Sequence, residues 1–297
     1  MNRAILMAVL MLSLTCIPSV FAADKSKLII GVIPEINLVK QMERFGPLAE
    51  YLDKKTGMDV EIKPLSNYGQ LLEEISAGKI DAGFFGSFVY AVTRAKAGII
   101  PIARPVKPGG KSTYSGLLMI RKDTGIKTPA DMKGKTIALV DPATTAGYLV
   151  QKEYFAKNGI AMEKDLKILW KGSHEAVIRA VLSHEAELGG AKDTIIARFR
   201  KENNAFDAII EVVSPGFKLE VPDNTLAVSK NLDEAKRELL KKTLLSMQSD
   251  PEGKKVLARF GAVRFIPTTD QDFRPLYDIM KHLKIDLKNY VYRRDKP

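Results

Sequence analysis

The chain of 297 residues has a single cysteine, Cys16, so no disulfide can form within it. It contains neither the G-x-S-x-G turn of serine hydrolases nor a phosphate-binding P-loop. Its three histidines have no spacing to acidic residues that resembles a metal site. After the first 25 residues, no apolar run approaches the ~20 residues that a membrane-spanning helix needs. We therefore predict no catalytic residue, no metal and no cofactor.

An uncharged apolar segment, residues 4–16, follows Arg3 at the start of the chain. A break at Pro18 and small residues up to Ala22 complete the pattern of a secretory signal peptide. We expect residues 1–22 to be a cleaved signal and the protein to be exported. A retained N-terminal anchor and a lipid on Cys16 are the alternatives, although Thr15 is a poor fit to the small residue that precedes a lipidated cysteine.

The formal net charge is +11, and Arg3 in the signal segment contributes one of these charges. The lysines are scattered along the chain rather than clustered in the stripe that nucleic acids require. No nucleic-acid partner is predicted. An excess of positive charge of this size does raise the local concentration of anions.

Strands and helices alternate along most of the chain, which is typical of βαβ units and mostly parallel sheets. One αβ set precedes residues 114–121, a second set follows them, and the segment from residue 232 onward is mainly helical. The pattern predicts an α/β fold of two lobes, with mixed, mostly parallel sheets flanked by helices. The chain would cross between the lobes twice, on hinge strands at residues 114–121 and around residues 225–228.

The run DPATTAGY, residues 141–148, joins a predicted strand at 136–140 to a predicted helix at 145–158. Ligands of open α/β sheets lie at the carboxyl ends of strands, and a helix start offers free N–H groups to an oxyanion. Thr144 and Thr145 add hydroxyl donors, while Ala146 and Gly147 would let a ligand approach the backbone. These features indicate an anion site. The alternative is plain capping of the helix by threonine.

Four further polar residues follow predicted strands and stand at or near predicted helix starts. Tyr68 and Ser87 lie before or at the start of two helices in the first set, and His174 opens a helix in the second. Asp193 follows a strand of small residues and could accept a hydrogen bond from a ligand amine or hydroxyl. For Ser87, His174 and Asp193, capping of the helix is the alternative role.

Several segments of the chain are similar to those of one known family: PLAEYLDKKTGMDVEI, NYGQLLEEISAGKIDAGFFGS, TYSGLLMIRKDT, KGKTIALVDPATTAGYLV, FAKNGI and GSHEAVIRAVLSHEAE with the following AKD. The most specific are the DPxxTxGY run and G-x-x-D-x-x-x-x-G at residues 78–86. The chain resembles the substrate-binding proteins of ABC transporters for phosphonate, phosphite and phosphate-like anions. These are two-lobed, type II periplasmic binding proteins, and the resemblance covers nearly all of the exported part.

The resemblance implies roles for particular residues. Tyr68 and Tyr114 would flank the ligand, and Thr144, Thr145, the N–H of Ala146 and His174 would hold the phosphonate oxygens. Asp193 would read a ligand amine, and a later acidic position falls on Asp223 or Asn224. Two residues depart from the family pattern: Ala146 stands where a serine is usual, and Asp193 where the aminophosphonate binders have glutamate.

The function that the resemblance implies is capture of a small phosphorus oxyanion between two lobes, followed by delivery to an ABC transporter permease at the inner membrane. Lobe 1 would comprise residues 23–117 and 226–297, and lobe 2 residues 118–225. We expect a periplasmic monomer. The alternatives are a binding protein for another small ligand, such as a sulfonate or a vitamin precursor, and a stand-alone sensor for a membrane receptor. An enzyme is not predicted.

Overall fold

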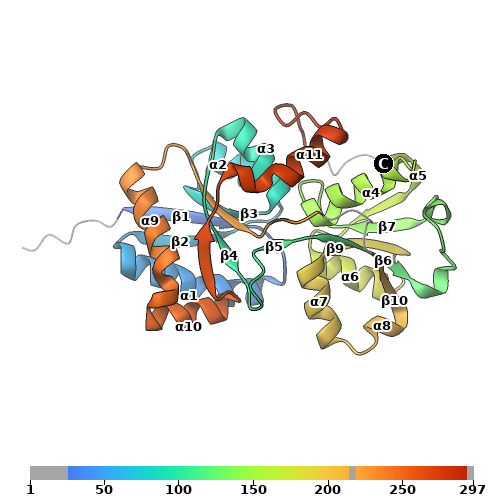
Figure 1. Cartoon of the computed structure of the whole chain (residues 1–297), viewed down its shortest axis with the longest axis horizontal. Coiled ribbons are helices and arrows are strands. Elements are labelled where there is room, and N and C mark those ends of the chain that lie inside the picture. Colours follow the sequence, from blue (N-terminus) through green and yellow to red (C-terminus); the bar gives the residue numbers. More distant parts are fainter. Residues whose placement is uncertain (1–25, 214–218, 293–297) are drawn as a thin grey trace, which may run out of the picture.

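The computed structural model describes residues 26–213 and 219–292. The predicted signal segment and Cys16 lie outside the described residues. Figure 1 shows two α/β halves side by side along the long axis, joined by strands that run between them. In the described ranges, no helix combines the length and apolar character needed to cross a membrane.

The larger sheet has six strands in the order β13-β4-β12-β3-β1-β2. Strands β1, β2 and β3 are parallel, while β12 runs antiparallel to β3 and β4, and β13 antiparallel to β4. We call the elements around this sheet the larger-sheet half. Its strands are β1 (Lys27–Val32), β2 (Asp59–Pro64), β3 (Ala82–Phe85), β4 (Ile100–Val106), β12 (Thr225–Val228) and β13 (Arg264–Pro267).

The smaller sheet has five strands in the order β10-β6-β9-β7-β8. Strand β7 is parallel to β8 and β9, whereas β6 runs antiparallel to β9 and β10. We call the elements around it the smaller-sheet half. Its strands are β6 (Gly116–Arg121), β7 (Thr136–Leu139), β8 (Lys167–Trp170), β9 (Leu188–Lys192) and β10 (Ile210–Val213).

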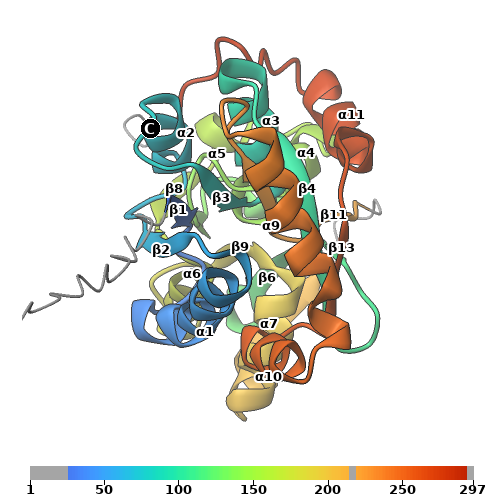
Figure 2. The same ribbon diagram turned by 90° about the vertical axis from the view of Figure 1, so that its left-hand side faces the viewer.

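Helices cover both sheets, as the alternating pattern predicts (Figure 2). Those of the larger-sheet half are α1 (Leu38–Thr56), α2 (Gln70–Ser76), α3 (Ser87–Ala97), α9 (Glu234–Ser246), η4 (Met247–Ser249), α10 (Pro251–Phe260), η5 (Asp270–Phe273) and α11 (Arg274–His282). Those of the smaller-sheet half are η1 (Lys122–Thr124), η2 (Pro129–Met132), η3 (Thr145–Leu149), α4 (Val150–Lys157), α5 (Met162–Asp165), α6 (His174–Leu182), α7 (Asp193–Glu202) and α8 (Phe206–Ile209).

A cluster of aromatic rings holds α1 and α10 against the larger sheet. The ring of Phe45 lies 5.1 Å from that of Phe84 and 5.2 Å from that of Phe260, both in edge-to-face geometry. Phe265 of β13 lies 5.5 Å from Phe260. Such pairs add about 0.5–1.5 kcal/mol each to the burial of the rings. This aromatic core covers one face of the larger sheet and fixes the positions of its strands.

Strand β9 carries the sequence LGGAK because helices approach it closely on both faces. A Cβ added at Gly189 would lie 2.7 Å from Val181 of α6, and one added at Gly190 would lie 2.4 Å from Gln151 of α4. Successive residues of a strand point to opposite faces. The glycines therefore let α6 and α4 pack tightly on the two sides, and they bring the end of β9 close to the start of α4.

The chain crosses between the halves at two short strands, β5 (Thr113–Tyr114) and β11 (Val221–Pro222), which pair antiparallel. This corrects the predicted crossings. Residues 114–121 divide into β5 and β6, and only β5 lies in the crossing. Residues 225–228 form β12, which is buried between β3 and β4 as a central strand of the larger sheet. An apolar strand of this kind is needed inside the sheet, so the second crossing falls just before it.

The residues that follow α11 extend back across the molecule toward the smaller-sheet half. The rings of Tyr290 and Tyr292 pack on Phe88 of α3, at 5.0 and 6.4 Å. The Tyr290 hydroxyl donates a hydrogen bond to the carbonyl of Pro142, in the loop after β7, at 3.1 Å. A further contact between the halves joins His282 Nδ1 to Glu153 Oε2 of α4 at 2.7 Å.

Candidate functional site

A small cavity lies where the two halves meet. Its volume, measured as the space open to the centre of a water molecule, is about 10 Å³. The residues that line it are Ile33, Glu35, Tyr68, Gly86, Tyr114, Ala143, Thr144, Thr145, Ala146, His174, Lys192 and Asn224. The structure thus brings together Tyr68, Tyr114, Thr144, Thr145, Ala146 and His174 from the predicted set. Ser87, Asp193 and Asp223 are not in this wall.

The loop after β7 and the helical turn η3 form one side of the cavity. Turn η3 is a π-type turn, in which the N–H of Leu149 donates to the carbonyl of Thr144 at 3.1 Å. The first N–H groups of a helix have no partner within it, and together they attract an anion. Thr145 and Ala146 provide such N–H groups at the cavity wall.

The two threonine hydroxyls are engaged within the protein. Thr144 Oγ1 donates to the carbonyl of Asp141 at 2.7 Å, which stabilises the loop locally. Thr145 Oγ1 accepts a hydrogen bond at 2.8 Å from the N–H of Phe88 in the other half. Neither arrangement is the capping alternative, because neither hydroxyl accepts from an N–H of η3. Thr144 has used its proton, whereas Thr145 accepts and keeps its own O–H as a donor. The N–H groups of residues 143 and 144 already donate to Asp141, so the backbone donors that this turn offers are those of residues 145 and 146.

Gly147 is required by packing rather than by a ligand. A Cβ at this position would lie 2.4 Å from Val140 Cγ2 and 2.8 Å from Thr144 Oγ1. Real Cβ atoms do not make such contacts. The glycine therefore allows η3 to lie directly on the end of β7, which places the N–H groups of residues 145 and 146 at the cavity.

Two tyrosines face the loop from opposite sides. Tyr114 lies at the crossing strand β5, and its hydroxyl accepts a hydrogen bond from the N–H of Ser87 at 3.2 Å. Tyr68 is 2% exposed, and its hydroxyl has no hydrogen-bond partner among the described residues. Burial raises the pKa of this hydroxyl well above its usual range, so it stays protonated. Leaving a buried hydroxyl unpaired costs about 1–3 kcal/mol. The Tyr68 O–H is therefore a donor to which a bound ligand could supply the acceptor.

His174 opens α6 behind the N-cap residue Ser173, whose hydroxyl accepts from the N–H of Ala176. Burial lowers the pKa of His174 to about 4, although the nearby Glu35 carboxylate opposes that shift, so the ring is neutral at pH 7. Its Nδ1 accepts a hydrogen bond from the N–H of Lys192 at 3.2 Å. A neutral imidazole that accepts at Nδ1 carries its proton on Nε2. His174 therefore offers one fixed N–H donor.

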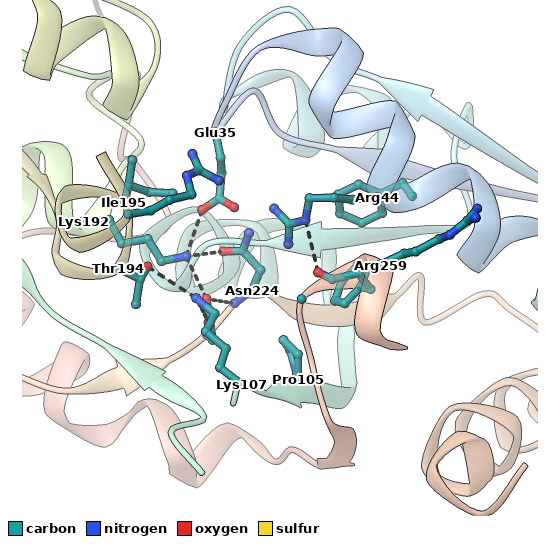
Figure 3. Close-up of a pocket in the computed structure, with 14 residues that line it drawn as sticks. Glu35, Arg44, Pro105, Lys107, Lys192, Thr194, Ile195, Asn224 and Arg259 are labelled. Carbon is teal, nitrogen blue, oxygen red and sulfur yellow. Dashed lines mark hydrogen bonds and ion pairs between the residues drawn. The ribbon is translucent and has the colours of Figure 1, made fainter. Parts of the chain in front are cut away.

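Lys192, at the end of β9, is the main feature that sequence reasoning missed. Its side chain is 3% exposed, and its Nζ lies 2.7 Å from Asp223 Oδ1 and 2.9 Å from Glu35 Oε1. It lies 3.4 Å from Asn224 Oδ1 and 4.4 Å from the centre of the Tyr114 ring. Figure 3 shows Lys192 pointing toward Glu35 and Asn224. We call Lys192, Glu35, Asp223 and Asn224 the lysine cluster.

The three ionisable residues of the lysine cluster are charged at neutral pH. Burial alone would lower the pKa of Lys192, but the carboxylates of Asp223 and Glu35 outweigh it and the pKa is raised. Burial would raise the pKa of Asp223, but Lys192 and Lys107 hold it well below its usual range. Lys107 Nζ lies 2.5 Å from Asp223 Oδ2. Two ammonium groups therefore face two carboxylates, and the charges balance.

Asp193, the residue after Lys192, points elsewhere. It opens α7, and its Oδ2 accepts a hydrogen bond from Lys111 at 2.8 Å while its Oδ1 accepts from the N–H of Thr194 at 2.7 Å. The signal for Lys192 was present in the sequence. A lysine at the last position of a buried strand of small residues, at the same sheet edge as the loop after β7, must find a partner there.

Ser87 and Asp223 lie next to the cavity rather than in its wall. The Ser87 hydroxyl is fully buried and donates to the carbonyl of Pro222 at 2.9 Å, which joins the start of α3 to the crossing strand β11. Asp223 follows that strand and faces a second, larger chamber on the far side of the lysine cluster.

This outer chamber has a volume of about 270 Å³. Basic side chains outnumber acidic ones in its wall, with Arg44, Lys107, Lys192, Arg198 and Arg259 against Glu35 and Asp223 (Figure 3). Arg44 is held in place because its Nε donates to the carbonyl of Phe260 at 3.1 Å. The lysine cluster separates this chamber from the inner cavity. Within the described ranges, no group of three or more His, Cys, Asp or Glu residues could hold a metal ion.

Comparison with known proteins links this geometry to transport proteins. The phosphate-import protein PhnD of Mycolicibacterium smegmatis is 29% identical over 177 residues, which cover 56% of this chain and 55% of that protein. The chain thus spans about half the length of that relative. The phosphonates-binding periplasmic protein of Escherichia coli is 24% identical over 253 residues, which cover 83% of this chain and 73% of that protein.

Solved structures confirm the predicted fold. A binding-protein component of an ABC phosphonate transporter from Pseudomonas aeruginosa has a TM-score of 0.78 at 22% identity, covering 88% of this chain and 87% of that one. PhnD1 from Prochlorococcus marinus, solved in complex with methylphosphonate, has a TM-score of 0.76 at 20% identity, covering 87% and 98%. These are α/β, type II periplasmic binding proteins.

A family model also matches most of the chain, from residue 30 to residue 273, and its description is "ABC transporter, phosphonate, periplasmic substrate-binding protein". The matched segment contains every residue of the inner cavity wall. This chain therefore belongs to the family of periplasmic substrate-binding proteins of phosphonate ABC transporters.

Proposed function

We propose that this protein captures a small phosphorus oxyanion (a phosphonate, phosphite or phosphate) in the inner cavity and delivers it to an ABC transporter. The observation that carries the proposal is the Tyr68 hydroxyl, which is buried at the cavity wall without an acceptor. The N–H groups of residues 145 and 146 and the Nε2–H of His174 are further donors at this wall, so the cavity is suited to a ligand that accepts hydrogen bonds.

The donors form a set that a tetrahedral oxyanion can satisfy. They are the Tyr68 O–H, the His174 Nε2–H and the N–H groups of residues 145 and 146, with the helix start η3 adding partial positive charge. Hydrogen bonds to a charged group contribute about 1.5–3 kcal/mol each. Four of them can supply the ~8 kcal/mol that micromolar affinity requires, after the cost of ordering.

Closure of the two halves would enclose the ligand. A cavity of about 10 Å³ has room for little more than one water molecule, so an anion enters while the halves are apart. We propose lobes close to the predicted ranges, residues 23–117 with 226–297 and residues 118–225, with each boundary moved to β5 or β11 so that β6 and β12 both stay whole. A hinge motion of this kind is common among binding proteins that close around a ligand.

The chain would work in the periplasm after removal of residues 1–22, as a monomer, and its partner would be the permease of an ABC transporter at the inner membrane. No catalytic role is proposed, since the polar groups of the cavity bind and orient rather than activate a nucleophile. Another small ligand, such as a sulfonate, or a sensing role toward a membrane receptor would be the alternative.

Isothermal titration of the exported form, residues 23–297, tests the proposal. We expect saturable binding of at least one of phosphate, phosphite and methylphosphonate, at micromolar affinity or tighter, and no binding of sulfate at the same concentration. Absence of heat with all three phosphorus anions would overturn the proposed function, and tight binding of sulfate or a sulfonate alone would move it to the alternative.

A further inference from the structure

The lysine cluster has the composition of a binding site for an organic ammonium ion. Two carboxylates, the Asn224 side-chain oxygen and the face of the Tyr114 ring surround one buried point. Carboxylates and an aromatic face are the groups that proteins use to hold a cation away from water. In this chain the ammonium at that point belongs to the protein itself, because Lys192 fills it.

The cluster also forms part of the cavity wall. Glu35, Lys192 and Asn224 line both the inner cavity and the outer chamber, so the Lys192 ammonium stands between them. The backbone N–H of Lys192 donates to Nδ1 of His174, which places the proton of His174 on Nε2. Lys192 therefore also orients the N–H donor of His174. A ligand bound to the anion donors would therefore have its other end toward Lys192.

We infer that Lys192 is a specificity-determining residue that restricts the ligand to phosphorus oxyanions whose other end carries no positive charge, and so excludes aminoalkylphosphonates. The inference rests on the proposed function and narrows its substrate class. With Lys192 and Lys107 paired to Glu35 and Asp223, a ligand ammonium finds no carboxylate free to receive it. The ammonium of Lys192 also repels it at close range.

The charge balance of Lys192 and Lys107 with Glu35 and Asp223 has a second consequence. Loss of the Lys192 ammonium leaves the cluster with two buried carboxylates and only Lys107 against them. The wall beside the cavity then becomes negative, which disfavours a bare anion and favours a ligand that brings its own ammonium. The same residue thus raises affinity for one class of phosphonate and lowers affinity for the other.

The test compares methylphosphonate with 2-aminoethylphosphonate by isothermal titration. For the unaltered protein we expect methylphosphonate to bind at least ~10-fold more tightly, which corresponds to ~1.4 kcal/mol. Lys192→Ala, which opens space beside the carboxylates, should reverse this order. Lys192→Met also removes the charge but fills the space, so it should weaken methylphosphonate and gain less for the amine than Lys192→Ala does. Lys111→Ala, which removes a half-exposed lysine paired with Asp193, should leave both affinities unchanged.

The outcomes separate the two proposals. If no phosphorus oxyanion binds the unaltered protein, the proposed function fails. If 2-aminoethylphosphonate binds it as tightly as methylphosphonate, or if the ratio is the same in Lys192→Ala, the inference about Lys192 is overturned while the function stands. Should Lys192→Ala fail to fold, Lys192→Ala with Glu35→Gln removes one of the uncompensated carboxylates, and the ratio in the unaltered protein still decides the question.

Discussion

The Tyr68 hydroxyl allows a role in ligand binding to be distinguished from a role in stability by a single substitution. Its hydroxyl is buried and unpaired, so it lowers the stability of the free protein, and this cost should be offset only when a ligand accepts a hydrogen bond from it. Tyr→Phe at this position should therefore weaken phosphorus oxyanion binding by about tenfold or more, while the melting temperature stays the same or rises. Titration calorimetry and thermal denaturation measure the two effects.

Tyr90 is the matched control for Tyr68. Tyr90 is also buried, but its hydroxyl donates to Asp270 Oδ1 at 3.0 Å, and neither residue lines the cavity. Tyr90→Phe should lower the melting temperature and leave affinity unchanged. If Tyr68→Phe binds the anion with full affinity, the Tyr68 hydroxyl does not contact the ligand.

At the residue scale, the sequence predicted the positions of helix starts better than the direction of side chains. Five predicted residues reach the cavity because each follows a strand that ends at the shared edge, and the sixth, Tyr114, lies in the crossing strand β5. Thr144 and Thr145 reach it with hydroxyls that already bond Asp141 and the N–H of Phe88. Lys192 ends β9 and Asp193 opens α7, so the sequence pattern does not distinguish which of these two neighbours points toward the cavity. The pairing of Lys192 with Glu35 joins segments 157 positions apart, which no local pattern indicates.

The turn η3 is the element on which the proposed anion site depends most. It lies against the end of β7 only because Gly147 has no side chain. Gly147→Ala should destabilise the protein by about 1–3 kcal/mol, since the new Cβ overlaps Val140, and should weaken anion binding because the N–H groups of η3 move. Chemical denaturation and calorimetry on one preparation give both values.

Gly46 offers a comparison for Gly147 within a regular helix. It lies inside α1, and a Cβ there would meet nothing within 4 Å. Gly46→Ala should be neutral or stabilising by up to about 1 kcal/mol, through helix propensity alone. Equal effects of the two substitutions would show that the packing of η3 on β7 does not determine the site.

At the element scale, most helices and strands follow from hydrophobic periodicity and from glycine stops such as Gly57 and Gly98, both of which have positive φ. The crossings between halves did not follow, because a two-residue strand such as β5 or β11 has no periodicity to read. A stretch of one threonine and three apolar residues at 225–228 is equally consistent with a hinge and with a central strand. Only the pairing of β12 with both β3 and β4 distinguishes them.

Over the whole molecule, positive charge gathers at the outer chamber, which leads toward the lysine cluster. Long-range attraction of an anion to such a chamber acts on the rate of association and is screened by salt. We expect the association rate constant of methylphosphonate to fall severalfold as ionic strength rises from about 20 to about 200 mM, over which the screening length shortens to less than 10 Å.

Arg259 should account for part of the salt dependence of the association rate constant. It lies on α10 at the rim of the chamber, so Arg259→Gln should lower the association rate constant at low salt about twofold and change the dissociation rate constant little. Lys254→Gln removes the same charge from an exposed position of the same helix that does not line the chamber. Stopped-flow titration compares the two variants, and equal rates in both would assign the effect to net charge alone.

The residues that follow α11 give the halves a third connection, built of side chains instead of backbone. Tyr290 and Pro142 are 148 positions apart in the chain, and the contact between them, like that of His282 with Glu153, joins the two halves. If the halves part to admit a ligand, as we propose, both contacts have to break first. The segment between α11 and Tyr292 would then slow the release of a ligand that it does not touch.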